Sequence, residues 1–295
     1  MTPFKNYGYQ IIFFMIVYET VSGLQKHLSN LGNKKIGFVP TMGALHNGHL
    51  ALIKIAKQHC DIVVCSIFVN PTQFNNAKDL EVYPRTIASD SKMLEDEFCD
   101  ILFAPSVTEI YIPSETEKLE SINFGLLTTI MEAAYRPGHF DGVVAVVKRL
   151  FEIVKPQIAF FGEKDYQQLC VVKQLVSTYN FDIEIVGCPI IRETDGLAMS
   201  SRNMNLSSDE RNAAAEIPEI LKAAVAKFTT LSAKDIKEWV VKQLANHAIL
   251  KLEYFELAHN NTLQLLEDEE INAKDARAFI VVFAGKTRLL DNMVC

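Results

Sequence analysis

The stretch "KIGFVPTMGALHNGHLALIKIAKQ", residues 35–58, runs from an apolar, strand-like segment through a turn into an amphipathic helical segment. Such a turn leaves backbone N–H groups unpaired, and the helix dipole adds partial positive charge, so anions bind there. Gly43 and Gly48 allow a ligand to approach the backbone closely, and Gly48 is expected to supply a backbone donor. His46 and His49, at positions i and i+3, lie on one side of the helix start and can donate hydrogen bonds. The stretch therefore predicts a site that stabilises charge developing on the α-phosphate of a nucleotide.

Two other interpretations of the histidine pair stay open. His46 and His49 could be ordinary polar residues near a turn, or they could be two ligands of a zinc site. A structural zinc site needs four ligands, and only two are present locally. The strand before the motif and the helix after it favour the phosphate interpretation, because such motifs are informative only in that context.

Short apolar runs alternate with helical patterns from residue 35 onward. A first strand is expected from Met15 into residues 17–19, and further strand-like runs occupy residues 35–40, 61–69, 100–105, 157–161 and 181–189. Helix-like segments occupy residues 49–59, 89–98, 143–154 and 166–179. The runs are nearly all apolar, as in parallel strands that are covered on both faces. The pattern predicts an α/β fold with a doubly wound, Rossmann-like parallel sheet, which binds ligands at the carboxyl ends of its strands.

The pattern changes after about residue 195. Residues 207–210, "SSDE", indicate a capping box that opens a helix to about residue 228, and a second helix follows from about Ser232. Residues 251–258, 278–284 and 287–293 are strand-like, and the last two runs are joined by a turn at "GK". We expect a Rossmann-like nucleotide- and substrate-binding domain over residues 1–190. A smaller α+β C-terminal domain, which acts as a lid, is expected over residues 191–295.

Composition narrows the class of protein. The chain has 295 residues, a formal net charge of −7 and 49% hydrophobic residues, which is enough to bury a large core. An acidic balance without a basic run argues against nucleic-acid and membrane-surface binding. The six cysteines form no CxxC pair, which favours reduced thiols in a cytoplasmic protein. The apolar run 11–17 is too short to span a bilayer, which takes about 20 residues, and residues 1–14 are expected to be an appendage.

Two polar segments could contact a nucleotide. In "FFGEKDYQQ", residues 160–168, Gly162 ends a strand, Lys164 could neutralise phosphates and Asp165 could accept hydrogen bonds from ribose hydroxyls. A solvated turn would have the same composition. The segment "DGLAMSSRNMNLS", residues 195–207, carries two serines and Arg202 at the domain boundary. This segment could close over a triphosphate like a lid, or it could be only a linker.

Two further segments suit a small polar substrate. Asn70, Gln73 and Tyr83 follow a strand end, and uncharged amide donors there suit a hydroxy-carboxylate. Arg136 and His139 lie in "YRPGHFDGV", residues 135–143, where a well-packed turn is an equally good explanation.

Together the motifs carry a family resemblance. "VPTMGALHNGH", "FVNPTQF", "YPRT", "FFGEKDYQQ" and "DGLAMSSRN", in this order and spacing, closely resemble the pantothenate synthetase (pantoate–β-alanine ligase) family. The resemblance covers nearly the whole chain from Met15 and includes "TRLLDN" near the C-terminus. The HxGH element alone is shared with a wide superfamily of nucleotidylyltransferases and class I tRNA-synthetase-like proteins.

The resemblance implies a ligation in two steps. Pantoate attacks the α-phosphorus of ATP to give pantoyl adenylate and pyrophosphate, and the amine of β-alanine then displaces AMP. The resemblance further implies pantothenate biosynthesis, Mg²⁺ with ATP as co-substrate, no bound organic cofactor, and a homodimer formed through the larger domain. The enclosed site would protect the mixed anhydride from water.

The resemblance also implies roles for individual residues. His49 would have the acid or phosphate-stabilising role, with His46 beside it, and Gln73 and Gln168 would hold pantoate. The residues implied to line the ATP site are Met42, Gly43, Ala44, Leu45, His46, Asn47, Gly48, His49, Gly162, Glu163, Lys164, Asp165, Ile191, Met199, Ser200, Ser201 and Arg202. Within that set Ile191 and Met199 would contact adenine through the backbone, and residues 200–202 would meet the phosphates. Residues with a supporting role in the pocket would be Asn70, Tyr83, Arg136 and His139.

Two departures from the family pattern matter. Residues 1–14 are not part of it, and of the acidic residues that some members place at 88–93 for magnesium only Asp90 remains. The metal ligands therefore stay unassigned. Alternatives to the ligase are an adenylyltransferase of the same superfamily acting on another small substrate, and a non-catalytic nucleotide-binding module. A tRNA synthetase would want a basic anticodon-binding region, which this acidic chain lacks.

Overall fold

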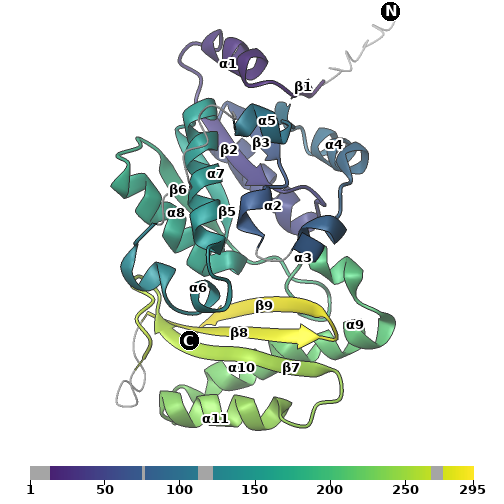
Figure 1. Cartoon of the computed structure of the whole chain (residues 1–295), viewed down its shortest axis with the longest axis vertical. Coiled ribbons are helices and arrows are strands. Elements are labelled where there is room, and N and C mark those ends of the chain that lie inside the picture. Colours follow the sequence, from purple (N-terminus) through teal and green to yellow (C-terminus); the bar gives the residue numbers. More distant parts are fainter. Residues whose placement is uncertain (1–13, 75–76, 112–121, 267–274) are drawn as a thin grey trace, which may run out of the picture.

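The computed structural model describes residues 14–74, 77–111, 122–266 and 275–295 (Figure 1). The expected appendage lies outside these ranges except for Phe14. Within them the large sheet has the strand order β1-β4-β3-β2-β5-β6, and all of its pairs are parallel. The strands of this sheet are β1 (Ile16–Tyr18), β2 (Ile36–Thr41), β3 (Ile62–Ile67), β4 (Ile101–Phe103), β5 (Ile158–Gly162) and β6 (Glu184–Cys188).

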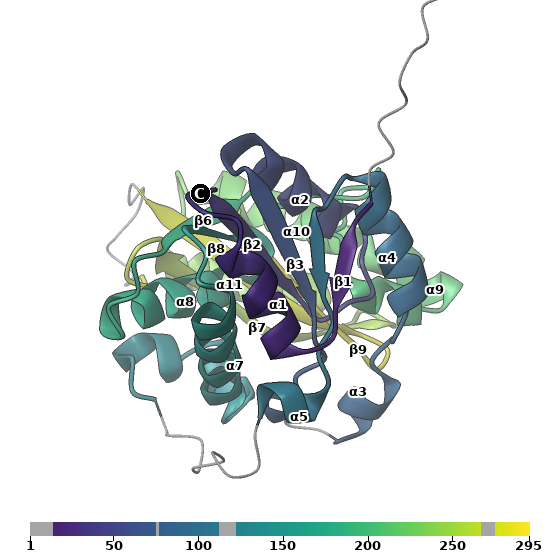
Figure 2. The ribbon, with the colours of Figure 1, turned by 90° about the horizontal axis from the view of Figure 1, so that it is seen from above.

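Helices cover both faces of this sheet (Figure 2). Successive strand residues point to opposite faces, so Phe38 belongs to one core cluster and Val39 to another. The first cluster packs against α1 (Val21–Ser29), α7 (His139–Val154) and α8 (Tyr166–Thr178), and the second against α2 (Asn47–His59) and α4 (Ile87–Asp96). Short helices in the connections are α3 (Ala77–Val82), α5 (Val107–Ile110) and α6 (Glu132–Tyr135).

The strand order reverses between β2 and β5. The chain goes from β2 to β3 on one side, whereas β5 pairs with β2 on the other side and continues to β6. The loops that leave β2 and β5 therefore diverge and open a crevice at the carboxyl edge of the sheet. This reversal places the histidine motif, which follows β2, beside the turn that follows β5.

The C-terminal part is a three-stranded antiparallel sheet with helices on one face. Its strands are β7 (Leu250–His259), β8 (Ala276–Ala284) and β9 (Thr287–Val294), and its helices are α9 (Ser208–Ala214), α10 (Glu216–Lys227) and α11 (Ala233–Leu244). One face of this sheet buries its apolar side chains against the helices. The other face packs Tyr254, Phe279 and Val281 against Met131 of the large-sheet part. In Figure 1, β9 lies nearest to the large sheet.

The predicted α/β class and doubly wound parallel sheet are confirmed, with a small α+β part after them. The single helix expected to residue 228 is wrong in one respect, because Ala215 separates α9 from α10. Pro218 lacks an N–H, and the first turn of a new helix accommodates it without losing a helical hydrogen bond. The capping box is present: Ser207 accepts from the Glu210 N–H, and the Glu210 side chain accepts from the Ser207 N–H.

Two other helices differ from expectation. Helix α7 begins at His139 rather than at residue 143, after Gly138 in a left-handed conformation. Helix α1 was not expected from the sequence; it is short, and only Leu24 of its nine residues is fully buried. No helix in the described ranges is both long and apolar enough to cross a bilayer.

Candidate active site

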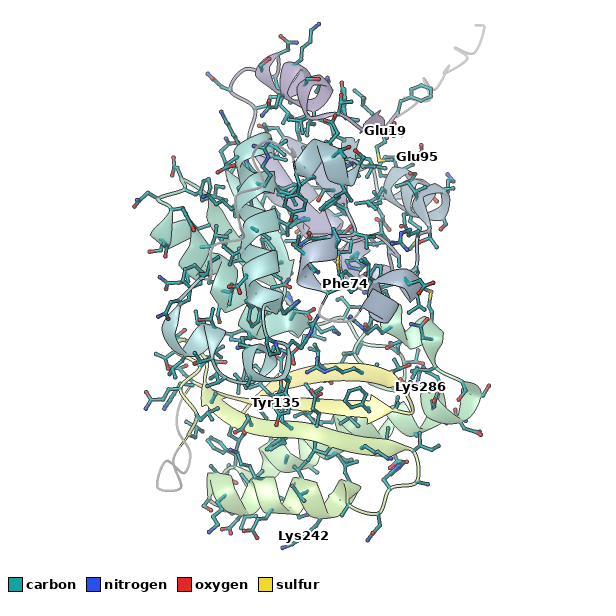
Figure 3. All side chains as sticks on the ribbon, in the orientation of Figure 1. Glu19, Phe74, Glu95, Tyr135, Lys242 and Lys286 are labelled. Carbon is teal, nitrogen blue, oxygen red and sulfur yellow. The ribbon has the colours of Figure 1, made fainter. Side chains whose placement is uncertain are left out.

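A cavity of about 220 Å³ opens at the reversal point, between the carboxyl ends of β2 and β5. The polar segments that the sequence singled out converge on it. Its lining includes Met42, His46, Gly48, His49, Asn70, Gln73, Tyr83, Gly162, Lys164, Asp165, Gln168, Ile191, Met199, Ser200, Ser201 and Arg202. A cleft of about 670 Å³ adjoins the cavity between the two sheets, and Tyr135 and Lys286 of its lining are labelled in Figure 3.

Several predicted residues lie beside this cavity rather than in its lining. Ala44 and Leu45 belong to the loop that follows β2, and both are buried. Arg136 and His139 line a smaller neighbouring cavity next to the C-terminal sheet. The residues outside the cavity lining are Gly43, Ala44, Leu45, Asn47, Glu163, Arg136 and His139.

The loop after β2 is fixed by a buried carboxylate. Asp90, only 1% exposed, accepts hydrogen bonds from the N–H groups of Ala44 and Leu45, each at 2.9 Å. The Thr86 hydroxyl donates to the same carboxylate at 3.1 Å. Gly43 has a φ of 79°, and a Cβ there would lie 2.9 Å from the Ile67 side chain. Both oxygens of Asp90 thus hold the loop backbone, which accounts for an acidic residue at this position without any metal.

His46 caps the helix that carries His49. Its Nδ1 accepts a hydrogen bond from the Gly48 N–H at 3.1 Å, so the proton of the neutral ring is on Nε2. The expectation that Gly48 supplies a backbone donor to a ligand is therefore wrong, because the His46 ring already occupies that N–H. A Cβ at residue 48 would lie 2.8 Å from the His46 ring, so a glycine is needed here. The donor available at this helix start is an imidazole.

The two imidazoles form a close pair. Their ring centroids are 4.1 Å apart, and Nδ1 of His49 is buried without a hydrogen-bond partner. Burial lowers the pKa of His49 to about 3, with smaller effects from His46 and the Lys164 charge. Burial and then the Lys164 charge lower the pKa of His46 to about 4. Both rings are consequently neutral at pH 7 before any ligand binds.

The turn after β5 carries the cationic side of the cavity. Glu163–Asp165 form a short 3-10 turn, and the Lys164 side chain is 19% exposed with its Nζ 3.7 Å from the Asp165 carboxylate. The backbone of this turn is held from the C-terminal sheet, because the Asn292 side-chain amide donates to the carbonyls of Glu163 and Lys164. Asn292 lies in "TRLLDN", which contributed only to the family resemblance and to a predicted strand.

Uncharged amides form another part of the cavity lining. The Asn70 amide, 1% exposed, donates to the Gly142 carbonyl at 3.1 Å and to the Gln73 side-chain oxygen at 3.2 Å. Tyr111 donates from its hydroxyl to the Asn70 oxygen at 2.8 Å. Gln168 also lines the cavity, whereas its neighbour Gln167 is buried. These bonds orient the Gln73 and Asn70 amides without placing a charge beside them.

His139 supports this side from behind. Arg136, which can only donate, lies 3.1 Å from His139 Nε2, so His139 Nδ1 carries the proton and donates to the Gln73 carbonyl at 2.9 Å. Burial lowers the pKa of His139 to about 4, followed in effect by the Arg136 charge. Arg136 also pairs with Glu132 at 3.5 Å. His139 therefore supports Gln73 directly, and Arg136 supports it through His139. Neither residue belongs to the lining of the cavity, although Arg136 lines the adjoining cleft.

The segment between the two sheets completes the lining. The Met199 N–H donates to the Ile191 carbonyl at 3.0 Å, so this N–H is already paired, while the carbonyl keeps a second lone pair. Ser200 accepts from the Arg202 N–H at 3.3 Å and caps the 3-10 turn Ser201–Asn205. Tyr83 approaches Ser201, with 3.4 Å between their hydroxyl oxygens. Figure 3 labels Phe74, which packs edge-on against the ring of Tyr83.

Metal ligation by the protein alone finds little support. Among the described residues there is no group of three or more His, Cys, Asp or Glu side chains that could hold a metal ion. Asp165 is the one carboxylate among the described residues of the cavity lining. One carboxylate together with substrate phosphates is a usual way to bind Mg²⁺, so the residues present fit a metal that arrives with the nucleotide.

Known proteins of one kind resemble this chain over almost all of its length. The profile of the family described as "Pantoate-beta-alanine ligase" matches residues 16–294. A pantothenate synthetase of Flavobacterium psychrophilum is 47% identical over 284 residues, 95% of this chain and 99% of that one.

Two solved structures share the fold. A pantothenate synthetase from Thermus thermophilus superposes with a TM-score of 0.87 and 40% identity, covering 95% of this chain and 99% of that one. A pantoate-beta-alanine ligase from Francisella tularensis, complexed with "Beta-gamma ATP and Beta-alanine", has a TM-score of 0.79 and 38% identity, covering 95% and 98%. The family profile, the relative and the two solved structures agree, and this chain belongs to the pantoate-beta-alanine ligase family.

Proposed function

We propose that the chain joins pantoate to β-alanine in two steps, of which the first consumes ATP. The pantoate carboxylate attacks the α-phosphorus of ATP, so an O–P bond forms and the bond to pyrophosphate breaks. The neutral amine of β-alanine then attacks the acyl carbon of pantoyl adenylate. A C–N bond forms, AMP leaves with the C–O bond electrons, and the amine nitrogen loses a proton. Family membership supports this reaction, as does the Francisella neighbour, which is described with a nucleotide and β-alanine.

One observation carries the proposal for this chain. A single cavity is lined by a histidine pair, a lysine and a set of uncharged amides. The cationic and imidazole side suits a triphosphate, and the amide side suits a hydroxy-acid whose carboxylate must remain nucleophilic. A cation paired directly with that carboxylate would weaken the nucleophile, so neutral amides are the better hosts.

The neutral imidazoles suit the first step. A neutral ring donates a hydrogen bond from one nitrogen and can take up a proton when negative charge arrives nearby. The lowered pKa of His49 means that it stays neutral until phosphates enter, so its interaction strengthens as charge develops on the α-phosphate. His46 Nε2, whose proton is fixed by the Gly48 contact, is the second donor.

Assignments for the rest of the cavity follow the same division. Lys164 would neutralise phosphate charge and Asp165 would accept from ribose hydroxyls, while Ser200, Ser201 and Arg202 would meet the phosphates. Gln73 and Gln168 would hold pantoate. Adenine would contact the backbone of Ile191 and Met199, where the Ile191 carbonyl can accept a second hydrogen bond. When bound, Mg²⁺ would lower the charge on the triphosphate, with its ligands mostly from phosphates and water.

The segment around residues 195–205 is proposed to close over the phosphates, with the domain boundary near residue 190 and the C-terminal part acting as the lid. Its place in the cavity lining supports this. Hydrogen exchange across residues 195–205 should slow when ATP binds. Equal exchange with and without ATP would exclude closure.

The proposed setting is a homodimer in the cytoplasm. Strand β1 is the edge of the large sheet, and it exposes 41% of Ile16 and 50% of Val17, which suits contact with a second copy. All six cysteines are free and three are buried, as expected of a protein from a reducing compartment. Sedimentation of the purified chain would test the dimer.

A pyrophosphate-release assay tests the reaction. Pyrophosphate should form from ATP only when pantoate is present, and AMP and pantothenate should appear together once β-alanine is added. An adenylyltransferase would release pyrophosphate with a different acceptor and would form no AMP. A non-catalytic module would leave ATP intact under every condition.

A further inference from the structure

The side chain of Asn292 in β9 makes three polar contacts in a buried position. The residue is 1% exposed, and its Nδ2 donates to the Glu163 carbonyl at 2.9 Å and to the Lys164 carbonyl at 2.8 Å. Arg277 of β8 donates to its Oδ1. An arginine can only donate and a carbonyl can only accept, so the orientation of this amide is settled by its partners.

The two carbonyls belong to the turn that carries the lysine of the cavity. The Glu163 carbonyl lies in the peptide plane that contains the Lys164 N–H, and the Lys164 carbonyl lies in the next plane. The two hydrogen bonds therefore hold both peptide planes that flank the Lys164 Cα. Lys164 itself belongs to the cavity lining. Gly162, the residue before the turn, also lines the cavity, and a Cβ built on it would meet no atom within 4 Å.

Arg277 reinforces the same contact. Its guanidinium lies 3.8 Å above the centre of the Tyr166 ring and 3.4 Å from the Glu163 carboxylate. Arg277 is itself 5% exposed. Strands β8 and β9 therefore contact the turn and the first residue of α8, Tyr166. Arg277 contacts side chains, and Asn292 provides the hydrogen bonds to the backbone of the turn.

We infer that Asn292 is a positioning residue for Lys164, acting from the C-terminal sheet on the first step of the reaction. This inference rests on the proposed function of Lys164 toward phosphate. Asn292 is not among the residues that line the cavity, so it acts only through the backbone of the turn. A shift of the turn moves the root of the Lys164 side chain and with it the ammonium group.

The test uses Asn292→Asp, which keeps the size of the side chain and the partner of Arg277 but loses both donors. A carboxylate in that place would face two carbonyl oxygens, so the turn must move. Adenylate formation in single turnover should slow by about 10- to 100-fold, as misplacement by about 1 Å typically does. Asn292→Ala, which removes the donors without adding a charge, should slow it similarly and serves if the aspartate variant does not fold.

A double-mutant cycle separates positioning from general loosening. On a Lys164→Ala background, Asn292→Asp should cost less than about a further 3-fold, because the group that it positions is gone. The control Val240→Ala weakens the buried core around α11, which packs on β7 and α10, and should leave the adenylation rate unchanged once the protein is folded.

The outcomes are distinct. An equal loss from Asn292→Asp in both backgrounds, or a loss matched by Val240→Ala, would overturn the positioning role and leave the proposed function intact. A wild-type rate for Lys164→Ala would instead overturn the proposed role of Lys164, and the inference would fail with it.

Discussion

The loop 41–49 and the turn 162–165 face the same cavity, and each follows a strand of the large sheet, but their anchors come from different places. The loop is held by Asp90, from a helix of its own domain, 45 and 46 residues away in sequence. The turn is held by Asn292, from the C-terminal sheet, 128 and 129 residues away. The loop is therefore held within the large-sheet part alone, whereas the turn is held only when the C-terminal sheet packs against the large-sheet part.

The largest effect is expected at the loop. His49→Ala should slow adenylate formation by about 100- to 1000-fold, or roughly 3 to 4 kcal/mol, because it removes a donor that acts in the transition state. The second step, started from supplied pantoyl adenylate and β-alanine, should suffer less, because no pyrophosphate leaves. Single-turnover assays of each step measure both.

His59→Ala is the matched control, since His59 is an exposed histidine at the other end of the same helix. It should leave both steps unchanged. Equal losses in both steps of His49→Ala, together with a lower melting temperature, would make His49 a packing residue.

Asp90→Asn tests the anchor of the loop. An asparagine has one acceptor oxygen, so one of the two backbone N–H groups loses its buried partner, which costs about 1 to 3 kcal/mol of unfolding free energy. Adenylate formation should fall as well, because the loop leads into His46. Urea unfolding and single-turnover rates measure the two effects. Asp96→Asn, at an exposed site on the same helix, should change stability by no more than about 0.5 kcal/mol.

The loop should also dominate the response to pH. In the folded protein the pKa is about 4 for His46 and about 3 for His49, so the unfolded chain, with an ordinary histidine pKa, binds more protons at acid pH. The unfolding free energy should therefore be independent of these histidines above about pH 6.5. Below that pH it should decrease by about 1.4 kcal/mol per pH unit for each histidine. The fall for each ends near its folded pKa. His139, with a folded pKa of about 4, adds to the slope in every variant.

Urea unfolding between about pH 5 and pH 7 measures this slope. His49→Asn should reduce the slope of unfolding free energy against pH by the contribution of one histidine. A slope identical to that of the wild type would mean that His49 is not held neutral in the folded protein.

The smallest effect is expected far from both regions. Ser232 caps α11 by accepting from the Asp235 N–H at 3.1 Å, and Ser232→Ala should cost about 1 kcal/mol of stability. Adenylation at a temperature where the protein stays folded should not change. If this variant slowed adenylation, loosening of the C-terminal part would be enough to disturb the site, and the specific role of the β9 contact would lose its basis.

Much of the fold could be predicted because parallel strands covered on both faces leave a plain apolar signature. The runs at residues 35–40, 61–69 and 157–161 are of this kind, and each contains most of a strand of the large sheet. Helix α1 was missed; it is short, and only Leu24 of its nine residues is fully buried. The break between α9 and α10 at Ala215 was not predicted, because a capping box indicates where a helix begins and not where it ends.

The sequence predicted which segments form the site, but it did not predict the hydrogen bonds that hold them. Parallel topology brings the ends of β2 and β5 together, so His49 and Lys164 could be placed on one edge from their positions after strands. The partner of a single N–H depends on tertiary packing. Nothing local to "HNGH" indicates that the His46 ring takes the Gly48 N–H, or that Asp90 binds two N–H groups of the loop.

The order of these anchors along the chain has a consequence during synthesis. A ribosome adds about 5–20 residues per second, so Asn292 emerges roughly 6 to 26 seconds after Lys164, which precedes it by 128 residues. Asp90 is synthesised long before β9, which carries Asn292. A chain interrupted before β9 lacks the contact that holds the Lys164 turn, so this part of the cavity is complete only after β9 has been synthesised.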